Sequence, residues 1–200
     1  MRAMRQAWCL AMLIMALILS GCGGTPPTIS AEQGTHGEGL RVLPTPQSGT
    51  PIANPARLLI PAIKVDAFIE SVGIMSNGDM ATPTQSPWEN VGWYNAGPLP
   101  GQRGSAVIDG HLDRPGGAPA VFWRLREARV GDEVMVVDSA GKTLHFHVAR
   151  IAFYAPEEAP VQEIFGDDVG VHLNLITCAG DWVPSERQTT LRLVVFTSPG

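Results

Sequence analysis

The sequence has few cysteines, few aromatic residues and few charges. Its 200 residues include 3 cysteines, 6% aromatic residues and 16% charged residues, with a formal net charge of −5. So few cysteines exclude a disulfide-rich scaffold. The acidic balance offers no basic stripe to neutralise phosphates, so no nucleic acid partner is expected. With 22 glycines and 17 prolines, the chain favours turns and short strands over long helices.

Long apolar runs are also missing, except for a short one at the N-terminus. Residues 7–19 are apolar apart from Cys9, and they follow Arg2 and Arg5. A bilayer span needs about 20 apolar residues, so this run is typical of a signal-peptide core. It ends in "LSGC", which resembles a bacterial lipobox. We therefore expect a lipoprotein-type signal peptide over residues 1–21 and a lipidated Cys22, or an uncleaved anchor helix as the alternative.

Removal of Cys9 and lipidation of Cys22 leave Cys178 without a partner for a disulfide. A lone thiol in an exported domain is either a small buried hydrophobe or a nucleophile, and the cysteine count alone does not decide between them.

The chain divides into a tether and a folded region. Residues 22–55 are rich in Gly, Pro and Thr and carry no apolar period, so we expect a flexible tether. From residue 56 to 198, short apolar runs are separated by turn signals such as Ser139-Ala140-Gly141. We count seven or eight strands with little helix, which predicts an all-β barrel or sandwich.

Three residue types suited to acyl transfer fall near strand ends. "GSAVIDGH" ends at His111, "VHLNLITC" ends at Cys178, and Arg192 lies near the start of "LRLVVFT". A thiolate is the reactive form of cysteine, and an imidazole within reach supports it and protonates a leaving amine. An arginine can stabilise an oxyanion with a fixed set of donors. Together these residues predict a thiol acyl-transfer site.

These segments, with "VGWYNAGPLPGQRGSAVIDGHLD" and "LNLITCAGDW", resemble the sortase family over about residues 57–197. The "GWY" and "TCAGDW" stretches most resemble class E and F sortases, with class F preferred. The resemblance implies a closed eight-stranded β-barrel with one or two short helices. It also implies a cysteine transpeptidase that cleaves an LPxTG-like sorting signal and passes the acyl group to an amine.

Carried over by position, His111 matches the family's catalytic histidine, Cys178 its nucleophile and Arg192 its catalytic arginine. Arg187 is the competing arginine, because the loop after the cysteine varies in length. Thr177 matches the threonine before the nucleophile, which supports the substrate or the oxyanion.

No cofactor and no metal site are expected. His145 and His147 lie two apart on one strand face without a third ligand. Asp109 and Asp113 flank His111; they are expected to be solvated or capping, with orientation of the imidazole as the alternative.

The partners implied are secreted proteins with C-terminal LPxTG-like signals, an amine acceptor (a peptidoglycan precursor or a pilin lysine) and the membrane, through the lipid on Cys22. The expected location is the extracytoplasmic face of the bacterial cell membrane. Two other functions stay open: a lipid-anchored L,D-transpeptidase-like enzyme, and a binding lipoprotein without activity.

Overall fold

The structure is a computed structural model that describes residues 54–166 and 169–200. The predicted signal peptide, Cys22 and the predicted tether up to residue 53 lie outside the described residues.

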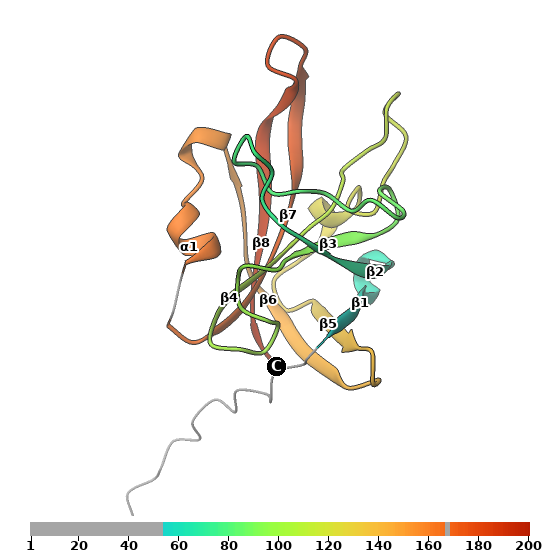
Figure 1. The fold of residues 1–200 in the computed structure, drawn as a ribbon, viewed down its shortest axis with the longest axis vertical. Coiled ribbons are helices and arrows are strands. Elements are labelled where there is room, and N and C mark those ends of the chain that lie inside the picture. Colours follow the sequence, from blue (N-terminus) through green and yellow to red (C-terminus); the bar gives the residue numbers. More distant parts are fainter. Residues whose placement is uncertain (1–53, 167–168) are drawn as a thin grey trace, which may run out of the picture. The chain divides into compact units, whose positions relative to one another are not determined.

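Eight strands close into a barrel (Figure 1). In chain order they are β1 (Pro55–Ile60), β2 (Val65–Val72), β3 (Val91–Tyr94), β4 (Gly104–Asp109), β5 (Glu133–Asp138), β6 (Thr143–Tyr154), β7 (Val171–Val183) and β8 (Gln188–Pro199). Around the barrel the order is β1-β2-β3-β4-β7-β8-β6-β5. The β2–β3 and β4–β7 pairs are parallel and the others antiparallel. The predicted closed eight-stranded barrel is confirmed.

Helical structure is limited to short connections. The 3-10 turns are η1 (Pro61–Ile63), η2 (Leu125–Glu127) and η3 (Pro156–Glu158), and α1 (Val161–Phe165) is the one α-helix in the part of the chain described. None of the helices within residues 54–166 and 169–200 has the length and apolar character needed to cross a membrane.

Two apolar clusters define the two sides of the β4–β7 sheet. The interior of the barrel contains Leu173, Leu175 and Ala179 of β7, all buried. The outer cluster contains Ile176 of β7 and Ile164 of α1. Because side chains alternate along a strand, even-numbered residues of β7 up to Cys178 point to the outer face.

The α1 segment covers part of that outer face. The side-chain amide of Asn174 donates to the carbonyl of Ile164 at 2.7 Å, and Ile164 is 2% exposed. Ile164 packs with Val107 of β4 and with Val194 of β8. The outer face of β7 is therefore covered by α1 near Asn174 and Ile176, and it becomes more open towards Cys178, which is half-buried.

Two strand boundaries and one strand differ from the sequence prediction. β4 ends at Asp109, two residues before His111. β7 does not end at Cys178: it continues to Val183 through an irregularity between Ala179 and Trp182, where Gly180 has a φ of +74°. β3 has four residues and was not predicted as a strand, because it is too short to show an alternating pattern.

Candidate functional site

Parallel pairing of β4 with β7 brings His111 and Cys178 to neighbouring positions. Asp109 lies opposite Ile176 in the register, and the Gly110 amide donates to the Ile176 carbonyl at 3.2 Å. His111 lies two residues beyond Asp109, and Cys178 lies two residues beyond Ile176. Both therefore lie at the same end of two adjacent strands. Adjacent strands lie about 4.8 Å apart.

Thr177 ties these two strand ends together. Its hydroxyl donates to the Gly110 carbonyl at 2.8 Å, and Thr177 is 3% exposed. Alternation places Thr177 on the opposite face of β7 from Cys178. The hydroxyl thus holds the backbone on which His111 and Cys178 are carried.

Arg192 lies on the other side of Cys178. Antiparallel pairing of β7 with β8 puts Cys178 directly opposite Arg192, and paired residues share one face of a sheet. The Arg192 Nη1 donates to the Thr189 carbonyl at 3.2 Å, to Thr189 Oγ1 at 3.0 Å and to the Leu191 carbonyl at 3.0 Å. These bonds fix the guanidinium before any ligand arrives.

Arg187 is far from this position. It has a φ of +55° in the turn that joins β7 to β8, and its amide donates to the Val183 carbonyl at 2.9 Å. Val183 and Gln188 pair five residues beyond Cys178 along β7 and four residues before Arg192 along β8. At about 3.3 Å per residue this is roughly 13–16 Å along the hairpin. The strand register therefore places Arg192, and not Arg187, opposite Cys178.

The His111 imidazole is half-buried against an aromatic ring. The ring centroids of Trp88 and His111 are 4.8 Å apart, with 43° between their planes. Burial lowers the pKa of His111, and the negative charge of Asp113 raises it in part. Trp88 was not singled out from the sequence, because nothing in "SPWEN" distinguishes it from the other tryptophans.

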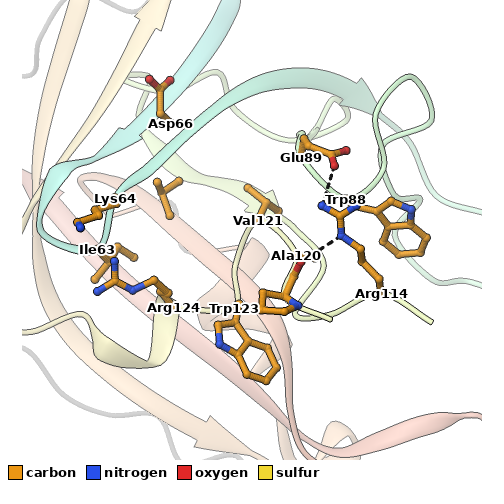
Figure 2. Close-up of a pocket in the computed structure, with 12 residues that line it drawn as sticks. Ile63, Lys64, Asp66, Trp88, Glu89, Arg114, Ala120, Val121, Trp123 and Arg124 are labelled. Atoms are coloured by element: carbon orange, nitrogen blue, oxygen red, sulfur yellow. Dashed lines mark hydrogen bonds and ion pairs between the residues drawn. The ribbon is translucent and has the colours of Figure 1, made fainter. Parts of the chain in front are cut away.

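Trp88 also forms part of the wall of an open cavity of about 440 Å³ (Figure 2). Its lining combines apolar residues such as Val65 and Val121 with charged residues such as Lys64 and Arg124. Arg114 reaches Glu89 across the rim, with 2.8 Å between Nη2 and Oε1. Neither Cys178 nor Arg192 lines this cavity.

One oxygen of the Asp109 carboxyl is shielded from solvent, whereas the sequence predicted a solvated or capping side chain. Its Oδ1 is buried and has no hydrogen-bond partner. Burial raises the pKa of the Asp109 carboxyl from 3.8 to about 7, although the backbone of Asp109 and Gly92 lowers it in part. The register pair with Ile176 and the strand alternation place Asp109 on the outer face, the same face as Cys178.

Histidines elsewhere do not gather into a metal site in the described residues. His145 Nδ1 lies 2.8 Å from Glu133 Oε1, an exposed pair on β5 and β6. No group of three or more His, Cys, Asp or Glu side chains suited to a metal ion occurs within residues 54–166 and 169–200.

Comparisons with known proteins identify the family and the fold. The family model described as "Sortase domain" matches residues 58–199. None of the curated proteins matches the chain.

Among solved structures, sortase A from Corynebacterium diphtheriae aligns with a TM-score of 0.57 and 22% identity, covering 74% of this chain and 61% of that one. Sortase C1 of Streptococcus agalactiae, solved as a complex with MTSET, aligns with a TM-score of 0.57 and 20% identity, covering 74% and 69%. Sortase C-1 from Actinomyces oris aligns with a TM-score of 0.57 and 24% identity, covering 74% and 75%. At these identities the likeness shows the fold.

Replacement of the buried carboxyl gives a test of its raised pKa. The folded protein holds a proton on Asp109 up to about pH 7, whereas the unfolded chain releases it near 3.8. Between these values the folded state binds more protons, so ionisation of Asp109 lowers the free energy of unfolding as pH rises, by at most about 1.4 kcal/mol per pH unit. Asparagine does not ionise, so in Asp109→Asn the free energy of unfolding does not fall with pH for this reason. We expect the stability of the variant relative to wild type, measured by urea unfolding, to increase from pH 4 to pH 7 and then level off. A difference that stays constant over this range would show that Asp109 ionises normally.

Proposed function

Because this chain belongs to the sortase family, whose members are cysteine transpeptidases, we propose that it cleaves secreted proteins at an LPxTG-like signal and joins the acyl fragment to an amine. The observation that carries the proposal is the position of the Cys178 thiol, between the strand that leads to His111 and the strand that holds Arg192. The family match favours this function over the L,D-transpeptidase-like enzyme and the inactive binding protein.

The first half of the reaction forms a thioester. The Cys178 thiolate attacks the carbonyl carbon of the scissile bond, and the negative charge moves to the carbonyl oxygen. The Arg192 guanidinium stabilises this oxyanion. The tetrahedral intermediate then collapses: the C–N bond breaks, the protonated His111 gives its proton to the leaving amine, and the acyl group stays on sulfur.

The second half reverses these roles. An acceptor amine attacks the thioester carbonyl, and the neutral His111 takes a proton from it. The C–S bond breaks, the new amide forms, and Cys178 returns to the thiolate. The acceptor is a peptidoglycan amine or a pilin lysine, and its identity separates wall anchoring from pilus assembly.

Subclass and anchoring complete the proposal. We assign the chain to class F, on the "GWY" and "TCAGDW" stretches. Sortases act at the cell envelope, and the "LSGC" sequence supports attachment of this one through a lipid on Cys22. Thr177 supports the site by holding the ends of β4 and β7 together.

Replacement of the nucleophile tests the reaction. Cys178→Ala removes one heavy atom from a half-buried position, so the fold should be retained by circular dichroism. Cleavage of an LPxTG peptide should fall below detection, because no other thiol of the described residues is available. The native thiol should react with a methanethiosulfonate reagent, and the variant should not. Cleavage that persists in Cys178→Ala would overturn the assignment.

The two arginines give a matched pair of variants. Arg192→Lys should lose about 10²–10³ in the single-turnover acylation rate, because an ammonium cannot reproduce the planar set of donors held by Thr189 and Leu191. Arg187→Ala should lose little, since Arg187 lies in the hairpin turn. The roles would be reversed if only Arg187→Ala lost two orders of magnitude.

Mass spectrometry tests the anchor. The protein extracted from membranes should begin at Cys22 and carry a diacylglycerol thioether, and Cys22→Ala should leave the signal peptide uncleaved. Recovery of mature protein with an intact Met1 would argue for an anchor helix instead.

A further inference from the structure

Glu70 of β2 gathers hydrogen-bond donors from a single loop. Its Oε2 accepts the amide N–H of Thr84 at 2.8 Å and of Gln85 at 3.1 Å. Its Oε1 accepts the Ser86 amide at 3.4 Å and the side-chain amide of Asn90 at 2.8 Å. One carboxylate therefore fixes both ends of residues 84–90.

The loop held in this way carries Trp88 to His111. Within it, the Asn90 amide donates to the Ser86 carbonyl at 2.8 Å, which closes a turn around Trp88. The Trp88 carbonyl accepts the Val121 amide at 2.8 Å, so the turn is also joined to the segment after His111. The Trp88 ring then lies 4.8 Å from the imidazole.

We propose that Glu70 is a positioning residue of the active site, which acts through residues 84–90 to hold the Trp88 ring against the His111 imidazole. The proposal rests on the proposed function for the role of His111 in catalysis. Glu70 does not touch His111 or Cys178; it determines where the ring that shields the imidazole lies. The contact has two effects, because it limits the orientations of the imidazole and keeps water from one of its faces.

A carboxylate suits this role better than a neutral side chain. Two oxygens accept all four donors, whereas a glutamine in the same place would direct an NH₂ group at backbone amides. Burial acts to raise the pKa of Glu70, but the bonds from Asn90, Thr84, Gln85 and Ser86 lower it to about 2. The carboxylate thus stays ionised over any pH range in which the enzyme would be assayed.

The loop also has other links to its surroundings, among them the single backbone bond from the Val121 amide to the Trp88 carbonyl. The Arg114–Glu89 ion pair joins it to the neighbouring loop (Figure 2), but both side chains are about half exposed. Exposed pairs of this kind contribute little to stability. Loss of the Glu70 bonds should therefore release the loop without unfolding the barrel, whose interior does not depend on it.

The test compares Glu70→Gln with Glu133→Gln in the full chain. Glu133 also pairs with another side chain, His145, but on β5 and β6, outside this network. For each variant, kcat and KM are measured with an LPxTG peptide, and the His111 pKa is measured by NMR titration of labelled imidazole. Glu70→Gln should lower kcat by about tenfold or more, with KM changed less than twofold, because a small misplacement of a catalytic group costs rate. The His111 pKa should rise towards 6.5, since burial lowers it in the wild type. Glu133→Gln should match wild type in all three.

Two more variants test the link through the ring. Trp88→Ala should raise the His111 pKa, as Glu70→Gln does, although the hydrogen bonds of Glu70 are intact. Trp88→Phe should keep most of the wild-type His111 pKa and kcat, because it retains an aromatic ring. If Glu70→Gln does not fold, Asn90→Ala removes one of the same bonds and decides in its place. Unchanged kcat and His111 pKa in a folded Glu70→Gln or Asn90→Ala variant would overturn the proposal. So would an unchanged His111 pKa in Trp88→Ala.

Failure of the two proposals can be told apart. The His111 pKa is read without any peptide, so its shift in Glu70→Gln supports the positioning contact even where the wild type cleaves no LPxTG peptide. In that case it is the transpeptidase function that fails. A wild type that cleaves the peptide, beside a Glu70→Gln variant that does so equally well with the same His111 pKa, rejects only the role of Glu70.

Discussion

The parallel pairing of β4 with β7 is the constraint on which the site depends. These strands are separated by more than sixty residues, and their register alone decides that His111 and Cys178 emerge side by side. The buried hydrogen bond from the Thr177 hydroxyl to the Gly110 carbonyl fixes that register at the end of the strands where His111 and Cys178 lie. A shift of one residue would turn Cys178 into the barrel interior, because successive side chains point to opposite faces. Pairing with β8 then adds Arg192 on the same face, so the fold defines the site through backbone hydrogen bonds before any side chain contributes.

The carboxyl of Asp109 is a destabilising feature of this arrangement. A carboxyl with a buried, unpartnered oxygen lowers stability at neutral pH, and an apolar residue there would pack with Ile176 and the rest of the outer cluster. Asp109 lies opposite Ile176, which is two residues before Cys178 on the same outer face. Proteins tend to retain unfavourable groups where function needs them, and perturbed carboxyls concentrate at such sites.

The hairpins of the fold could be predicted from the sequence, because each joins two strands that follow one another along the chain. The β5–β6 turn follows from Asp138 and Gly141: the Asp138 carboxylate accepts the Ala140 amide at 2.9 Å, and Gly141 has a φ of +83°. The parallel pairs leave no such signal, since neither strand carries information about its distant partner. The resemblance to sortases supplied the strand count that the pattern left at seven or eight. His111, Cys178 and Arg192 were proposed from the sequence because their chemistry suits acyl transfer and their positions match the sortase motifs. The contact between Trp88 and His111 could not be predicted, because it joins two loops whose meeting depends on the closed barrel.

Arg192 and His111, on the two sides of Cys178, are therefore held in place by different interactions. On one side, Arg192 is fixed within the β7–β8 hairpin, where a strand pairing and bonds to Thr189 and Leu191 leave it little freedom. On the other, His111 lies just past the end of β4, and its imidazole is bordered by a ring from a loop that depends on one carboxylate. An oxyanion needs donors that are in place before charge develops, so a rigid strand suits Arg192. In the proposed reaction the proton carrier must stay within reach of a leaving amine and then of an entering one, so the contact with Trp88, which limits the orientations of the imidazole, suits His111 while the strands hold the thiol in place.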